Sequence, residues 1–205
     1  MQNNLLKKVE QLFWRYGIRS VSMDDVAREL GISKKTLYQQ VENKTDLLTQ
    51  VLAQHVTEEQ AAIADIKESA SSAINELISI SRYAITRLRN ISASFRYDIE
   101  KYYPEQHTTF DQLQNDFFQA LVQENMIRGK AEGLYRANID EVVIAKFFGS
   151  MAKNIGMNTY FPIKQFALEH VVTQLVHYHI NGIASAKGQE LLCEYLDEET
   201  TKTTS

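Results

Sequence analysis

The chain of 205 residues is long enough for one compact domain or for a small domain joined to a larger one. Its composition excludes a membrane-spanning protein and a disulfide-stabilised secreted domain, because no stretch is sufficiently apolar and Cys193 is the single cysteine, so we expect a cytoplasmic location. The net charge of −4 is unevenly spread: residues 1–48 contain eight Lys or Arg and six Asp or Glu, which leaves −6 on the remainder.

A helical pattern opens the chain. Apolar residues recur at helical spacing along one face, namely Leu5, Val9, Leu12, Phe13 and Tyr16. Gly17 follows directly, and glycine commonly ends helices because it adopts a positive φ at little cost. We therefore expect a first helix that ends at Gly17.

The segment 22–38 predicts two short helices joined by a tight turn. Ser22 is suited to cap the first of them, with Asp25 three residues later in an approximate capping box. Gly31 lets the chain leave this helix, and Ser33 is a suitable N-cap for a second helix over about 34–41. This is the layout of a helix-turn-helix motif, whose second helix enters the DNA major groove.

The second helix of this motif has an unusually polar surface. Leu37 and Val41 are expected to be buried, which leaves Lys34, Lys35, Thr36, Tyr38, Gln39 and Gln40 exposed. Lysine, threonine and tyrosine donors suit phosphate oxygens, and glutamine and lysine also reach base edges. The alternative is a solvated helix in an ordinary bundle. DNA binding is the better interpretation because the caps, the turn and the surface chemistry agree.

A further helix start follows the motif. Asn43 is placed as a cap, with Asp46 three residues later. Lys44 then lies in the first turn, where its charge and the free N–H groups form an anion site suited to a DNA phosphate. Taken alone, Lys44 is better explained as a plain surface lysine.

Helical spacing continues through most of the remaining chain, which contains two prolines and no sustained period-two pattern. We expect an all-α protein of about nine helices, the later ones at about 45–66, 72–91, 94–103, 105–129, 140–158 and 164–186. We also expect a helix-turn-helix domain over 1–48, a helical domain over 49–196 and a frayed acidic tail over 197–205.

The last two expected helices are apolar around most of their circumference. The apolar residues of the first are Val142, Val143, Ala145, Phe147, Phe148, Met151, Ala152 and Ile155, and those of the second are Phe166, Val171, Val172, Leu175, Val176, Ile180 and Ile183. Such helices are either deeply buried in one chain or lie at an interface.

No established catalytic motif is present: the sequence lacks a phosphate-binding glycine loop, a G-x-S-x-G elbow and the CxxC or HExxH spacing of metal sites. His170 and His177 lie two helical turns apart and, with His179, suggest a metal site, but no acid or cysteine converges on them. Core or interface histidines are the better interpretation. We therefore expect no enzyme activity, no metal and no cofactor.

Residues 5–48 resemble the N-terminal DNA-binding domain of the TetR family of transcriptional regulators. The resemblance rests on the L-F-x-x-x-G end of the first helix, the S-M-D-D-V-A-R-E-L-G-I-S core, the K-x-T-L-Y helix and the N-K-x-x-L-L entry to the fourth helix. It implies DNA-binding side chains at Ser22, Ser33, Lys34, Lys35, Thr36, Tyr38, Gln39 and Lys44. Of these, Ser22, Thr36, Tyr38 and Lys44 are expected to contact the backbone, and Lys34, Lys35 and Gln39 to contact base edges or both. Members usually carry an aromatic residue in place of Val41, which predicts lighter packing of this helix here.

The resemblance also implies what the rest of the chain does. Residues 49–196 would bind a small-molecule effector of unknown identity and form a homodimer through a four-helix bundle of the last two helices and their symmetry mates. Such a dimer would bind two half-sites of a near-palindromic double-stranded operator, roughly 34–36 Å apart. The effector would release the DNA. The aromatic residues of this region either line its pocket or form packed core, and the sequence does not distinguish these.

We thus expect a ligand-responsive repressor. One alternative is an activator or a regulator that responds to no effector. Another is a helical small-molecule carrier whose helix-turn-helix motif has lost contact with DNA.

Overall fold

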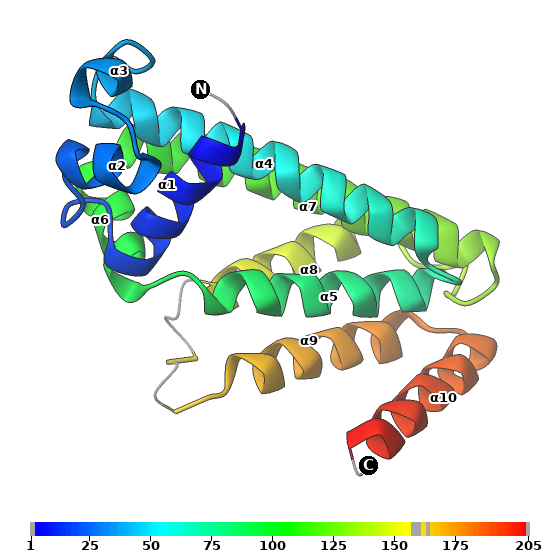
Figure 1. The fold of residues 1–205 in the computed structure, drawn as a ribbon. Coiled ribbons are helices and arrows are strands. Elements are labelled where there is room, and N and C mark those ends of the chain that lie inside the picture. The colour runs from blue at the N-terminus through cyan, green and yellow to red at the C-terminus, as the bar shows by residue number, and fades with distance from the viewer. Residues whose placement is uncertain (1–2, 157–160, 163–164, 204–205) are drawn as a thin grey trace. The chain divides into compact units, whose positions relative to one another are not determined.

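The computed structural model describes residues 3–156, 161–162 and 165–203 (Figure 1). Its described residues form ten helices, which confirms the all-α fold class. They are α1 (Asn3–Tyr16), α2 (Met23–Leu30), α3 (Lys34–Tyr38), α4 (Lys44–Ser69), α5 (Ala73–Arg89), α6 (Ala93–Tyr102), α7 (Pro104–Ala131), α8 (Glu141–Gly156), α9 (Leu168–Ile183) and α10 (Ala186–Thr203). None of the helices in these ranges has the length and hydropathy needed to cross a bilayer.

The chain is organised in two compact units. Unit 1 contains residues 1–64 and 87–115, and unit 2 contains residues 65–86 and 116–205. Helices α4, α5 and α7 each contribute residues to both units. The expected division at residue 48 therefore stays a prediction about function, since the compact unit that holds the helix-turn-helix motif also includes part of α4 and all of α6.

Unit 1 has its own apolar core. Helix α1 packs against α2 and α6, and α2 packs against α3. The core side chains include Phe13, Ile18, Leu37, Leu47 and Leu48, all fully buried. Phe95 and Ile99 of α6 complete this core. The helix-turn-helix motif is therefore supported by α4, which follows it directly in the sequence, and by α6, which lies much further along the chain.

The core of unit 2 is formed by the first part of α5, the second part of α7, and α8, α9 and α10. Ile74, Met126 and Ile180 are among its most deeply buried side chains. Phe148 of α8 lies between Phe118 and His179, with ring centroids 5.8 and 4.2 Å away. Helices α8 and α9 thus share one buried apolar face within the chain.

The sequence predicted nine helices, and the tenth arises because the expected helix 164–186 ends earlier. Ala184 leaves the helix with extended backbone, and α10 begins at Ala186. The reason is a short pairing with a distant segment. The N–H of Arg136 donates to the carbonyl of Ile183, and the N–H of Ser185 donates to that of Leu134, both at 2.9 Å. These bonds take backbone groups that a continuous helix would use.

The end of α7 also differs from the prediction. We expected it at Gly129, but the helix continues to Ala131 and the residue with positive φ is Gly133. Gly129 has another purpose, because a Cβ there would overlap the ring of Tyr135. The glycine therefore allows close packing inside a helix.

The remaining differences concern helix ends. Helix α10 continues to Thr203, into the stretch from residue 197 where we expected a frayed tail. Residues 204–205 lie outside the described residues. The expected end of the eighth helix at 158 and the expected start of the ninth at 164 also lie outside them.

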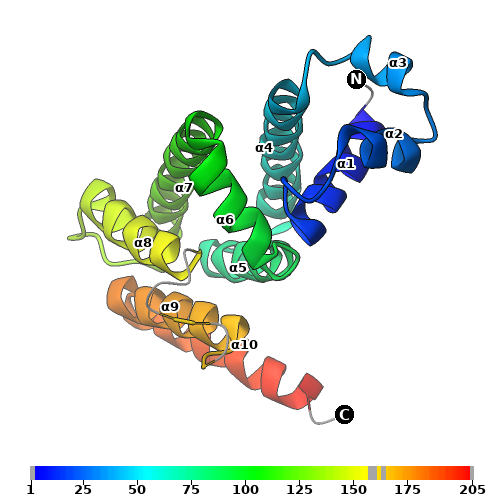
Figure 2. The ribbon, with the colours of Figure 1, turned by 90° about the vertical axis from the view of Figure 1, so that its left-hand side faces the viewer.

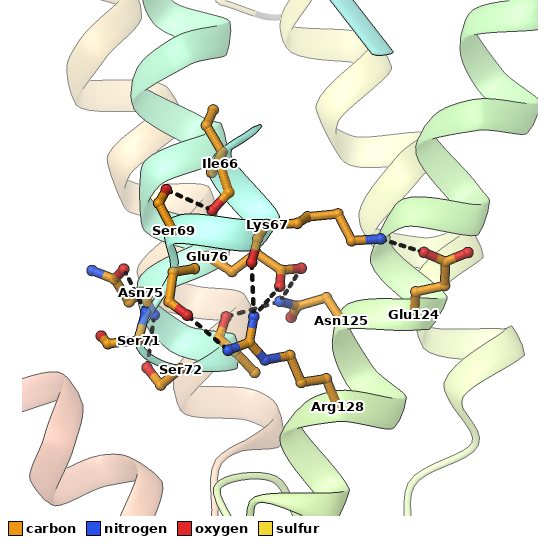
Figure 3. Close-up of polar contacts among 12 residues, drawn as sticks. Ile66, Lys67, Ser69, Ser71, Ser72, Asn75, Glu76, Glu124, Asn125 and Arg128 are labelled. Atoms are coloured by element: carbon orange, nitrogen blue, oxygen red, sulfur yellow. Dashed lines mark hydrogen bonds and ion pairs between the residues drawn. The ribbon is translucent and has the colours of Figure 1, made fainter. Parts of the chain in front are cut away.

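A buried polar cluster joins the end of α4, the start of α5 and α7 within unit 2 (Figure 3). Glu76 accepts hydrogen bonds from Asn125 Nδ2 at 3.0 Å and Arg128 Nη1 at 2.7 Å. The Arg128 guanidinium also donates to the carbonyl of Ala70 at 2.8 Å. This arginine therefore binds both a buried carboxylate and a backbone carbonyl just beyond the end of α4.

Candidate nucleic-acid interface

The capping box predicted at the start of α2 is present. The N–H of Asp25 donates to Ser22 Oγ at 3.1 Å, and the N–H of Ser22 donates to Asp25 Oδ2 at 2.9 Å. Gly31 has a φ of 66°, and the N–H of Ile32 donates to the carbonyl of Ala27 at 3.0 Å. The turn between the two helices is thus fixed by residues that the sequence identified.

Helix α3 is shorter than predicted, because it ends at Tyr38 instead of Val41. The N–H groups of Gln40 and Val41 both bond to the carbonyl of Leu37, which forms a turn. Leu37 and Val41 are buried, as predicted. The side chain of Ser33 caps the helix by accepting from the N–H of Thr36 at 3.0 Å.

The eight predicted DNA-binding residues lie on α3, at the start of α2 and at the start of α4. Six of them are exposed, namely Ser22, Ser33, Lys34, Lys35, Tyr38 and Gln39, and two are half-buried, namely Thr36 and Lys44. The side chain of Tyr38 is available to a partner outside the chain, since about half of it is exposed. The structure therefore brings all eight to the part of unit 1 that holds the helix-turn-helix motif, and their contact with DNA stays a prediction.

The two lysines of α3 differ in their electrostatic surroundings. Lys34 forms an ion pair with Asp24 of α2. Lys35 is exposed and has no ion-pair partner within the described part of the chain. Lys35 is therefore the α3 cation whose charge is available without breaking an existing contact.

The start of α4 agrees with the predicted cap. The N–H of Asp46 donates to Asn43 Oδ1 at 3.0 Å, and the N–H of Glu42 donates to Asp46 Oδ2 at 2.9 Å. Burial lowers the pKa of Lys44, and the charge of Asp98 opposes this change. A partly desolvated ammonium group next to free helix N–H groups is a good partner for an anion.

The sequence did not reveal that α6 supports the loop before Ser22. The N–H of Arg19 donates to Asp98 Oδ2 at 2.7 Å. Gly17 ends α1 with a φ of 87°, as predicted, and a Cβ there would also lie 2.9 Å from both Asp98 Oδ2 and Ser94 Cβ. Gly17 therefore has a second role, the close approach of α6, which no local sequence signal indicates.

A second feature missed by the sequence is a buried polar cluster that joins α1, α4 and α5. His55 Nδ1 lies 2.6 Å from Glu10 Oε1, and Arg87 Nη2 lies 3.2 Å from the same oxygen. The Arg87 guanidinium also lies over the ring of Trp14, 4.7 Å from its centroid. These contacts hold the DNA-binding end of unit 1 to its supporting helices.

Unit 1 also contains a small cavity of about 220 Å³ between α4 and the start of α7. Its lining is mainly apolar and consists of Thr49, Leu52, Ala53, Glu105, Gln106, Thr109, Phe110 and Leu113. This volume is below the roughly 300–1,000 Å³ typical of drug-sized ligand sites.

The three histidines considered as metal ligands do not form a common site. His170 is exposed, whereas His179 is buried against Phe148. Burial lowers the pKa of His179 to about 4. No group of three metal-ligating side chains occurs among the residues that the structure describes.

The capped α2, the glycine turn and the exposed basic surface of α3 define a helix-turn-helix DNA-binding protein. A family model for bacterial regulatory proteins of the tetR family matches residues 5–51. An HTH-type transcriptional regulator of Bacillus subtilis (strain 168), YvaF, is 25% identical over 189 residues, which cover 90% of this chain and 96% of that protein. Residues 5–51 thus form a helix-turn-helix domain of the tetR family of bacterial regulatory proteins, and the chain as a whole is similar to an HTH-type transcriptional regulator.

Solved structures agree with the fold. A transcriptional regulator from Cytophaga hutchinsonii ATCC 33406 superposes with a TM-score of 0.73 at 18% identity, covering 89% of this chain and 97% of that one. A TetR-family regulator from Streptomyces coelicolor has a TM-score of 0.66 at 19% identity, covering 87% and 90%. A protein from Saccharomonospora viridis, solved in complex with choline, has a TM-score of 0.72 at 18% identity, covering 88% and 96%.

Proposed function

We propose that this DNA-binding transcriptional regulator is a repressor that binds a near-palindromic operator as a homodimer and is released by a small-molecule effector. The observation that carries the proposal is the surface of α3, where Lys35, Tyr38 and Gln39 are exposed on a helix whose start and supporting turn are fixed by side-chain caps. Such a surface offers a duplex both phosphate donors and base-edge donors.

We assign the roles within the site by side-chain chemistry. Ser22, Thr36, Tyr38 and Lys44 bind the DNA backbone, and Lys34, Lys35 and Gln39 contact base edges, with Ser33 holding the start of α3. Because Lys34 is paired with Asp24 in the free chain, it exchanges that partner for DNA. Lys35 makes no such exchange, so its replacement should have the larger effect on affinity.

The homodimer is supported by an exposed apolar face on α8. Val143, Phe147 and Met151 recur every four residues and are exposed, whereas Ala145 and Phe148 of the same helix are buried. The side chain of Phe147 is 61% exposed. The face that the sequence predicted to exceed the needs of one chain is therefore uncovered in one subunit, and a second copy would cover it.

Binding of a small-molecule effector is supported by a solved protein of similar fold. The related structure from Saccharomonospora viridis holds choline, and we propose that this chain also binds a small molecule. A ligand that favours the non-binding state by about 3 kcal/mol weakens operator affinity more than a hundredfold. Helix α4 is the element through which it acts, because α4 begins at Lys44 and contributes residues to both units.

The test replaces Lys35 and Tyr38 together by alanine. The variant should lose about a hundredfold in affinity for a duplex selected by the wild-type chain, since it removes from each subunit the base contact of Lys35, worth roughly 1–3 kcal/mol, and the backbone contact of Tyr38. Its melting temperature and dimer mass should not change, because both side chains are exposed. Equal affinity of the variant and the wild type would contradict the proposed site.

The repressor role is tested in cells with a reporter gene behind the selected DNA. Expression should be low in the presence of the chain and should rise when the chain is removed. Loss of expression on removal of the chain would instead identify an activator.

A further inference from the structure

Two cations and two tyrosines meet where the loop after α1 contacts the end of α6. The guanidinium of Arg19 lies 4.2 Å from the ring centroid of Tyr102. The ammonium of Lys101 lies 4.9 Å from the centroid of Tyr97 and 5.5 Å from that of Tyr102. The two tyrosines are 52% and 39% exposed, and their rings are 6.0 Å apart. We call these four residues the α6 corner.

The positive charges of the α6 corner are not neutralised within the described chain. Neither Arg19 nor Lys101 forms an ion pair with any described carboxylate, including Glu100 and Glu105, which are close in sequence. Asp98 is buried and accepts a hydrogen bond from the backbone N–H of Arg19, without an ion pair to its guanidinium. The stacked cations therefore keep donors that face solvent.

The α6 corner lies beside the predicted contacts to the DNA backbone. Arg19 precedes Ser22 by three residues, and its charge and that of Asp98 both act on the ammonium of Lys44. Helix α6 runs within unit 1 so that its C-terminal end points to the side that carries α3 and the start of α4 (Figure 2). The corner thus extends the surface formed by Ser22 and Lys44.

We propose that Arg19 and Lys101 bind DNA phosphates that flank the bases contacted by α3. Tyr97 and Tyr102 hold the two cations in place, as flat aromatic surfaces do for guanidinium and ammonium groups. This inference rests on the proposed function, because it requires a bound duplex. A lysine in the last turn of α6 also offsets the helix dipole, but that explanation accounts for neither Arg19 nor the exposed rings.

The test is the salt dependence of DNA affinity, measured on the full chain with a duplex that the wild type selects from a random-sequence pool. Each phosphate contact contributes about 0.9 to the slope of log affinity against log salt. Lys101→Ala and Arg19→Gln should each reduce the slope by about 0.9 per bound chain, or about 1.8 for a dimer. Lys101→Arg should keep the wild-type slope. Lys187→Ala, which removes an exposed charge in unit 2, serves as the control and should also keep it.

The outcomes separate this inference from the proposed function. If the wild type selects no duplex, the proposed function fails and the inference fails with it. If the wild type binds but the slopes of Lys101→Ala and Arg19→Gln equal the wild-type slope, the inference alone is overturned. The inference is also overturned if these variants lose DNA affinity only when they also lose the dimer or melt at a lower temperature. The α6 corner would then stabilise the fold or the dimer.

Discussion

Replacing Arg128 by methionine should destabilise the chain strongly, because the change leaves a buried carboxylate without its cation. The side chain of Glu76 is 1% exposed and lies 2.7 Å from the Arg128 guanidinium (Figure 3). Removing one partner of a buried ion pair costs about 3–5 kcal/mol. The loss is large compared with a total stability of roughly 5–15 kcal/mol for a typical protein.

The control is a second ion pair in the same region. Lys67 Nζ lies 2.5 Å from Glu124 Oε2, but both side chains are substantially exposed. Lys67→Met should therefore cost less than about 1 kcal/mol. Urea unfolding followed by circular dichroism distinguishes the two variants. With a slope of about 2 kcal/mol per M, Arg128→Met should lower the midpoint by about 1.5–2.5 M and Lys67→Met by at most about 0.5 M.

A double variant tests the reasoning itself. Glu76→Leu combined with Arg128→Met removes both charges and should recover most of the loss, because apolar side chains of similar volume often replace a buried pair without cost. The account of this cluster is refuted if Arg128→Met is no less stable than Lys67→Met, or if the double variant is less stable than both single variants.

Three further predictions concern other parts of the chain. Burial lowers the pKa of His179 from 6.5 to about 4, so the folded state favours the neutral imidazole. The free energy of unfolding should therefore fall by up to about 3 kcal/mol as the pH drops from 6.5 to 4. The variant His179→Leu should lack this loss when melting is measured against pH. Phe147→Glu should convert dimers to monomers in sedimentation, and an unchanged dimer would place the interface elsewhere. Gly17→Ala should cost more than about 1 kcal/mol in urea unfolding, since the site has positive φ and no room for a Cβ; a wild-type midpoint would contradict this.

Features set by neighbouring residues could be predicted from the sequence. The Ser22–Asp25 capping box, the turn at Gly31 and the Ser33 cap each involve residues at most five apart, so the pattern alone determined them. Burial of Leu37 followed from its helical spacing. The core of the candidate DNA-binding site was therefore the most predictable part of the chain.

Features set by distant residues could not be predicted in this way. The break between α9 and α10 depends on bonds between residues 134–136 and 183–185, about 50 positions apart. The support of Arg19 by Asp98 joins residues 79 positions apart, and the pair of Glu10 and His55 joins residues 45 apart. The ion pair between Lys34 and Asp24 likewise depends on how the turn between α2 and α3 packs, because no local sequence pattern indicates that these two residues meet.

Selection of duplexes from a random-sequence pool by the full chain, followed by footprinting, tests the central claim most directly. A homodimer that uses two copies of α3 should select an inverted repeat and protect two half-sites roughly 34–36 Å apart. Recovery of a single, non-repeated half-site, or of no preferred duplex at all, would contradict the account.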